Sequence, residues 1–173
     1  MENTMKIKLL ALLIAFAFVG FACSSSSSND DNNQADPLVG AWVSQGAGQV
    51  APGLAVLTKT AKIDAVFNQN NTYNVVAIDS SNVAVTFTGT WQAGEPNAQG
   101  IRSITLQQST PTQLVSSGIF RIDGNNMEYE VIQSQPALDG VVPPTVEGGF
   151  GSTNIGGNPT GIFWIQKYVR ATN

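Results

Sequence analysis

The stretch TAKIDAVF-NQNN-TYNVVAI-DSSN-VAVTFTGTW, residues 60–91, decides the fold. It holds three runs in which apolar and polar residues alternate, separated by two four-residue segments rich in Asn, Asp and Ser. Alternation sends successive side chains to opposite faces of a strand, and Asn, Asp and Ser favour turns. One face of the third run carries its large apolar residues, Val83, Val85, Phe87 and Trp91. The stretch therefore predicts three antiparallel strands joined by short hairpins.

Further runs with strand character flank this stretch, at residues 38–45, 101–107, 114–122, 127–133 and 161–170. The Asp-Gly-Asn-Asn segment at residues 123–126 is typical of a tight turn between two of them. No segment shows a convincing helical period. About eight short strands joined mostly by local hairpins predict an all-β fold, an antiparallel up-and-down barrel, with a two-sheet β-sandwich as the alternative. A barrel of about eight strands either fills with side chains or holds one small ligand.

Residues 1–22 have the order of a secretory signal peptide, with the basic Lys6 and Lys8, an apolar run over residues 9–22, and small residues before a cut. As a helix, the run would span about 21 Å, which is short of the roughly 30 Å hydrocarbon layer of a membrane. The run also lacks the polar face of a helix that packs on a core. We therefore expect residues 1–22 to be a signal peptide.

The residues that end in the single cysteine, Gly20-Phe21-Ala22-Cys23, resemble the box of bacterial lipoprotein signals. That resemblance implies that Cys23 receives a diacylglycerol group and becomes the first residue after cleavage. Gly20 and Ala22 also suit ordinary signal peptidase, which would leave Cys23 as a free amino-terminal thiol. Residues 24–36 hold no aromatic or large aliphatic side chain. Residues 23–36 are therefore expected to form a lipidated Cys and a disordered tether that spans roughly 20 Å.

The tether begins with five serines followed by Asn-Asp-Asp-Asn-Asn, which is similar to the tethers of surface lipoproteins in the Bacteroidetes group. The similarity implies a protein anchored to the outer membrane, facing either the cell surface or the periplasm. Each buried methylene of an acyl chain contributes about 0.8 kcal/mol, so two or three chains at Cys23 would make the membrane a firm partner.

Composition excludes several classes of function. Removing residues 1–22 takes two lysines and one glutamate from 8 basic and 12 acidic residues, which leaves 6 and 11 and a formal charge of −5. Without any Lys/Arg cluster, nucleic acid is not an expected partner. The chain has no histidine, which excludes His-based catalysis and imidazole metal sites. Glu128 and Glu130 share a strand face, but they alternate with apolar residues, so we expect a solvated outer face rather than an enzyme, cofactor or metal site.

Four short motifs resemble the lipocalin-like lipoproteins of bacteria. They are Leu38-Val39-Gly40-Ala41-Trp42, which matches the Gly-x-Trp of the first lipocalin strand, Phe67 with Thr72-Tyr73, Gly89-Thr90-Trp91, and Lys167-Tyr168-Val169-Arg170. The resemblance implies that residues 37–173 form one lipocalin-like β-barrel domain. It also implies that Trp42 closes one end of the barrel, with the side chain of Arg170 or Lys167 over its ring in a cation–π contact. We expect Trp42 to be a core residue with no part in ligand binding.

Two classes of function stay open. The first is a non-catalytic binder of a small apolar or amphipathic ligand, with the candidate wall residues Phe87, Trp91, Phe120, Tyr129 and Trp164. The second is a protein-interaction or structural module of the envelope with a filled core, which would use residues 134–160. That segment carries four prolines and six glycines in 27 residues, and long loops of this kind are often functional. We expect it to fold over a barrel mouth as a lid or to contact a partner, with residues 46–59 as a second candidate for that role.

Overall fold

The computed structural model describes residues 35–172 of the chain. The predictions for the signal peptide at residues 1–22, for Cys23 and for the tether up to residue 34 lie outside the described residues.

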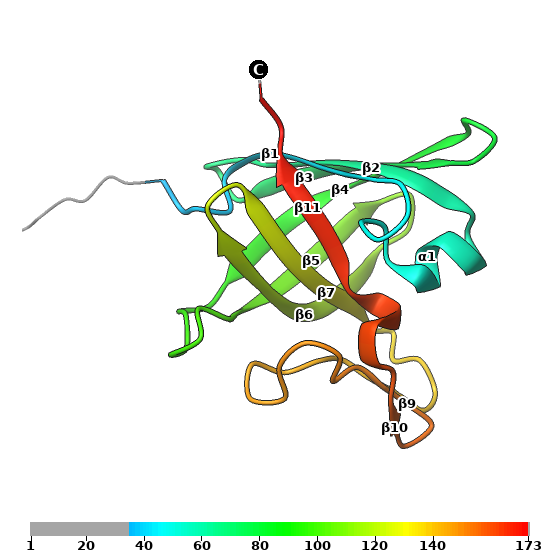
Figure 1. Ribbon diagram of the computed structural model, residues 1–173, viewed down its shortest axis with the longest axis vertical. Coiled ribbons are helices and arrows are strands. Elements are labelled where there is room, and N and C mark those ends of the chain that lie inside the picture. The colour runs from blue at the N-terminus through cyan, green and yellow to red at the C-terminus, as the bar shows by residue number, and fades with distance from the viewer. Residues whose placement is uncertain (1–34, 173) are drawn as a thin grey trace, which may run out of the picture. The chain divides into compact units, whose positions relative to one another are not determined.

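Eight antiparallel strands close into a barrel (Figure 1). In chain order the strands are β1 (Gly40–Gln45), β2 (Thr60–Phe67), β3 (Thr72–Asp79), β4 (Ala84–Ala93), β5 (Arg102–Thr110), β6 (Leu114–Asp123), β7 (Asn126–Gln135) and β11 (Gln166–Arg170). Consecutive strands from β2 to β7 pair with each other. β7 also pairs with β11, and β1 lies between β11 and β2 and pairs with both. The predicted up-and-down barrel is confirmed, and the two-sheet alternative is not formed. Because the sheet closes on itself, none of its strands is an edge strand with one side wholly unpaired.

The remaining described elements are short. They are the helix α1 (Pro52–Leu57), the 3-10 helix η1 (Gly161–Trp164), and a small sheet of β8 (Val141–Val142), β9 (Asn154–Ile155) and β10 (Asn158–Pro159). The helical period did not reveal α1, because six residues are too few to show one, although Pro52 occupies a favoured first position. No helix of the described residues is long and apolar enough to cross a membrane.

The last predicted strand was too long at its start. Residues 161–164 form η1 rather than a strand, and the pairing of β11 with β7 begins at Gln166 opposite Tyr129. Gly161 adopts a positive φ of 58°, and the Trp164 and Phe163 rings pack against Gly53 of α1. Packing against α1 therefore outweighs the alternating pattern of residues 161–165.

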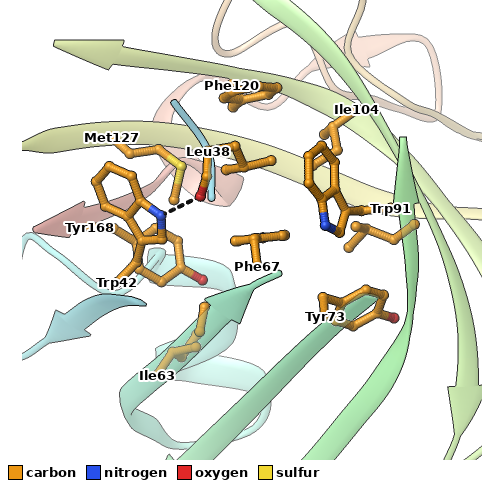
Figure 2. Close-up of a cluster of buried hydrophobic side chains, with 12 residues drawn as sticks. Leu38, Trp42, Ile63, Phe67, Tyr73, Trp91, Ile104, Phe120, Met127 and Tyr168 are labelled. Atoms are coloured by element: carbon orange, nitrogen blue, oxygen red, sulfur yellow. Dashed lines mark hydrogen bonds between the residues drawn. The ribbon is translucent and has the colours of Figure 1, made fainter. Parts of the chain in front are cut away.

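The alternation in residues 60–91 separates the inside of the barrel from the outside. Antiparallel partners share a face, and the register places Ala77 opposite Val85, Val75 opposite Phe87, and Trp91 opposite Leu106. Part of this inward set packs into one cluster with side chains from the other strands (Figure 2). Its members are Leu38, Trp42, Ile63, Ala65, Phe67, Tyr73, Trp91, Ile104, Leu106, Phe120, Met127 and Tyr168.

Residues 36–39 cross one end of the barrel, called here the closed end, and Leu38 is the residue that fills it. Leu38 is fully buried, and the Trp42 indole Nε1 donates a hydrogen bond of 2.9 Å to its carbonyl oxygen (Figure 2). The Arg170 guanidinium lies 4.1 Å from the Trp42 ring centroid and donates to the carbonyl oxygens of Pro37, at 2.7 Å, and Val39, at 3.1 Å. Three backbone carbonyls of the crossing segment are thereby held by two side chains.

A second arginine holds the start of the same segment. Arg102 donates to both carboxylate oxygens of Asp36, at 2.9 and 2.7 Å, and its guanidinium lies 5.0 Å from the Phe120 ring centroid. Burial alone would raise the pKa of the Asp36 carboxyl, but hydrogen bonds from Arg102 and the Leu38 amide, with the arginine charge, hold it below its ordinary value. The closed end is thus sealed by apolar packing inside and charged hydrogen bonds outside.

Residues 136–165 lie against the outer surface of the barrel, and this corrects the prediction for Glu130. Glu128 is partly exposed and pairs with Arg121, but Glu130 is fully buried, although both side chains point away from the interior. The Glu130 carboxylate accepts hydrogen bonds from the backbone amides of Gly151, at 2.6 Å, and Thr153, at 3.1 Å. A buried carboxylate needs such donors, so Glu130 attaches the long segment to β7.

Candidate ligand-binding site

A cavity of about 350 Å³ occupies the part of the barrel interior that the packed cluster leaves open. Its walls come from β2, β3, β4, β5, β7 and β11, with α1 beside them. Apolar side chains dominate the lining, among them Ile63, Phe67, Val75, Phe87, Leu106 and Val131. The volume is at the small end of the range of ligand pockets, which runs from about 300 to 1,000 Å³.

The β3–β4 hairpin forms one side of the mouth because it extends beyond its neighbour β5. Pairing of β4 with β3 begins at Ala84, whereas pairing with β5 begins only at Thr88. Val83 and Val85 line the cavity but are 60% and 44% exposed. The turn is set by Asp79, whose carboxylate accepts hydrogen bonds of 2.8 Å from the amides of residues 81 and 83. Figure 1 shows this hairpin projecting from the barrel, on the side where α1 lies.

The helix α1 also lies at the mouth and contributes Leu54 to the lining. The Ala51 amide before the helix donates to the Gln166 side-chain oxygen at 2.9 Å, and the Gln166 amide group donates to the Ser44 hydroxyl. These contacts connect the helix to β11 and β1. The other face of α1 is fixed at Gly53, where a Cβ atom would come within 2.7 Å of the Trp164 ring.

Three of the seven lining residues that carry a polar side-chain group are tyrosines; the others are Thr58, Thr60, Asp79 and Gln108. Tyr73, Tyr129 and Tyr168 all line the cavity, and Tyr73 and Tyr168 are only 4% and 5% exposed. The Tyr129 and Tyr168 rings are perpendicular, with centroids 5.9 Å apart. Burial raises the pKa of Tyr73 to about 12, and it raises the pKa of Tyr168 further. Burial, then the proximity of Tyr168 and Tyr73, raise the pKa of Tyr129 well above its ordinary value, so all three phenols are neutral at pH 7.

The candidate wall residues divide into three groups. Phe87 and Tyr129 line the cavity. Trp91 and Phe120 point inward too, but they belong to the packed cluster at the closed end (Figure 2). Trp164 lies in η1, beside Gly53 of α1, and does not line the cavity.

Two tyrosines were missed as wall residues. Tyr73 and Tyr168 were predicted only as parts of motifs, yet each occupies an inward position of its strand and lines the cavity. Tyr73 lies opposite Phe67, and Tyr168 lies opposite Met127. Because Phe67 and Met127 belong to the packed cluster inside the barrel, this register puts both tyrosines on the inner face. Alternation alone could have placed Tyr73, because it follows Phe67 across a hairpin predicted from the sequence.

The lid expected from residues 134–160 is not formed. None of these residues lines the cavity, and the segment packs instead on the outside of β7 through Glu130. The Arg121 guanidinium lies 5.7 Å from the Phe150 ring centroid, which is a further contact on the outer surface. Residues 46–59, proposed to share the role, contain α1 and do flank the mouth.

A second hollow of about 960 Å³ is larger, but it is more open and has a more polar lining than the cavity inside the barrel. Its lining is rich in threonine, serine and glutamine side chains, and it shares Tyr73 and Gln108 with the cavity inside the barrel. Such side chains hydrogen-bond water well, so this surface favours solvent over an apolar ligand. We therefore take the smaller, apolar cavity as the candidate binding site.

No family model, curated protein or solved structure matches this chain. Within residues 35–172, no group of three or more Asp, Glu, His or Cys side chains is placed to hold a metal ion. Fold and cavity together define the class: a closed eight-stranded antiparallel barrel with one packed end and one hollow end.

Proposed function

We propose that this protein is a non-catalytic, lipocalin-like lipoprotein of the cell envelope that binds a small apolar or amphipathic molecule inside its barrel. The observation that carries the proposal is the cavity of about 350 Å³ with mainly apolar walls. Removing apolar surface from water stabilises a bound ligand by roughly 25 cal/mol for each Å² buried. A cavity kept open beside a well-packed cluster is a costly feature for a barrel whose core serves only stability.

The experiment that tests binding is native mass spectrometry of the chain from residue 24 onward, secreted by a bacterial host. This chain keeps the whole barrel, and every member of the packed cluster lies between Leu38 and Tyr168. We expect a discrete excess mass that disappears on unfolding. A bare mass from several growth conditions, together with no uptake of an added apolar probe, would exclude a ligand binder.

The anchor is proposed on the lipoprotein resemblance around Cys23. The expected product is a chain that begins at Cys23, carries acyl groups and sediments with the outer membrane. Mass spectrometry of the amino-terminal peptide tests this, with Cys23→Ala as the variant that should lose the acyl mass and leave the membrane fraction. A wild-type chain with an unmodified terminal thiol would instead show cleavage by ordinary signal peptidase.

A second function, a protein-interaction module, is supported by the outer segment at residues 136–165. Four of its large apolar side chains are exposed to solvent, Leu138 by 42%, Val142 by 56%, Ile155 by 40% and Ile162 by 74%. Replacing Val142 and Ile155 with Ser should abolish a partner contact without changing ligand uptake. Co-purification of a stoichiometric partner with the wild-type chain, lost in this double variant, would favour the interaction module.

A further inference from the structure

Every tyrosine of the chain faces the same cavity. The sequence contains three, Tyr73, Tyr129 and Tyr168, and they come from three different strands, β3, β7 and β11. Because the strands are far apart in sequence, only closure of the barrel brings these side chains together. The mainly apolar lining of this cavity therefore carries three phenol groups that can hydrogen-bond to a ligand.

The three hydroxyls have no protein partner among the described residues, although their rings are packed by their neighbours. Tyr73 lies in contact with Phe67, with ring centroids 6.4 Å apart, and Tyr129 packs edge-on against Tyr168. All three residues line the cavity, and their hydroxyls are not among the buried polar atoms of residues 35–172 that lack a partner, so they are accessible. Water that fills the cavity can bond to these hydroxyls, so a ligand that displaces the water preserves their hydrogen bonds only if it accepts them.

The charge of the lining restricts the kind of acceptor. No Lys or Arg lines the cavity, and its one carboxylate, Asp79, stands at the mouth with hydrogen bonds to its own turn. A ligand carboxylate inside would be a buried anion without a counter-charge, which is strongly unfavourable. At the mouth it would meet the negative Asp79. A neutral oxygen acceptor has neither problem.

Resting on the proposed function, we infer that the three tyrosine hydroxyls are the polar recognition point of the cavity and that its ligand is a neutral apolar molecule bearing a carbonyl-type oxygen. Such an oxygen has two lone pairs and accepts hydrogen bonds from phenolic O–H donors. The aliphatic part of the ligand then lies against Phe87, Val75 and Val131. The tyrosines select the oxygen, and the cavity volume limits the size of the molecule.

The test compares three probes by calorimetry at pH 7: methyl hexyl ketone, octanoate and propylbenzene. The ketone is expected to bind about tenfold more tightly than octanoate, because the carboxylate loses its hydration without a counter-charge. Tyr129→Phe should weaken ketone binding about fivefold, the effect of one hydrogen bond, and leave propylbenzene binding within about twofold. Phe87→Leu is the matched control, since it changes an apolar wall and should weaken the ketone and propylbenzene alike.

The outcomes separate this inference from the proposed function. Octanoate binding as tightly as the ketone, or a Tyr129→Phe variant that weakens the ketone and propylbenzene equally, would overturn the inference while leaving an apolar binder. Failure of both the ketone and propylbenzene to bind would overturn the proposed function itself. Retained propylbenzene binding shows in the same experiment that the Tyr129→Phe variant is folded.

Discussion

Leu38→Ala should destabilise the barrel more than any other single leucine truncation outside the strands. Leu38 is fully buried between Trp42, Phe120 and the other members of the packed cluster. Its backbone cannot move inward to fill a void, because Trp42 and Arg170 hold the carbonyl oxygens of residues 37–39. Leucine truncations in cores cost about 2–5 kcal/mol, and the larger values belong to sites that cannot collapse. We therefore expect a loss of about 3–5 kcal/mol in the free energy of unfolding.

Urea unfolding of the chain from residue 24, followed by tryptophan fluorescence, measures this loss, because Trp42 and Trp91 are buried. The midpoint should fall while the slope with urea stays constant, as expected for a change in stability alone. Leu57→Ala is the matched control: Leu57 is 66% exposed in α1, so its truncation should change stability by less than about 0.5 kcal/mol. If the two variants differ by less than about 1 kcal/mol, the closed end does not depend on Leu38.

Three further predictions concern the cavity, the outer segment and the helix at the mouth. Tyrosine ionisation, followed by ultraviolet absorption, should be absent near pH 10 in the folded protein, since burial raises the pKa of Tyr73 to about 12 and holds the pKa values of Tyr129 and Tyr168 well above their ordinary value. Because the unfolded phenols ionise near pH 10, this contribution to stability is complete below about pH 10 and is lost as the pH rises toward 12 and above. Glu130→Gln should destabilise the protein by about 1–3 kcal/mol and expose residues 136–165 to protease, because an amide group would replace an acceptor opposite the Gly151 or Thr153 N–H. Gly53→Ala, which in an exposed helix would stabilise by about 1 kcal/mol, should destabilise here, because the new Cβ would lie 2.7 Å from the Trp164 ring.

Each of these predictions has a control and a contrary result. A phenolate signal at about pH 10 in the folded state would show that a tyrosine faces bulk solvent rather than an apolar cavity. Glu128→Gln changes a partly exposed ion pair and should cost no more than about 1 kcal/mol, so equal effects at Glu128 and Glu130 would contradict the attachment of the outer segment. A higher melting temperature for Gly53→Ala would mean that α1 and η1 do not pack tightly.

Much of the barrel could be predicted because its strands carry a local pattern. The alternating runs in residues 60–91 became β2, β3 and β4, with the predicted apolar face turned inward. The same pattern misled at residues 161–164, where packing of Trp164 against Gly53 set a different local conformation. It also could not distinguish Glu128 from Glu130, because both point outward and only the later segment covers one of them.

The contact between Trp42 and Arg170 shows what a family resemblance can add to local pattern. Nothing in the spacing of these residues indicates that they are neighbours, yet they lie directly opposite each other where β1 pairs with β11. The guanidinium stacks on the indole and also binds the segment that crosses the barrel end. The resemblance suggested the pair, and the register of the first and last strands determines its geometry.

The sequence by itself determined the strand period, the hairpin turns and which side chains of β4 point inward. It could not determine how deep each inward side chain lies. Phe87 and Trp91 share one face of one strand, but Phe87 lines the cavity while Trp91 packs in the cluster at the closed end. Alternation reports the face of a strand and not the position along the barrel axis. That position depends on strand register, on closure, and on Leu38 from outside the sheet, so only the tertiary structure separated the binding wall from the core.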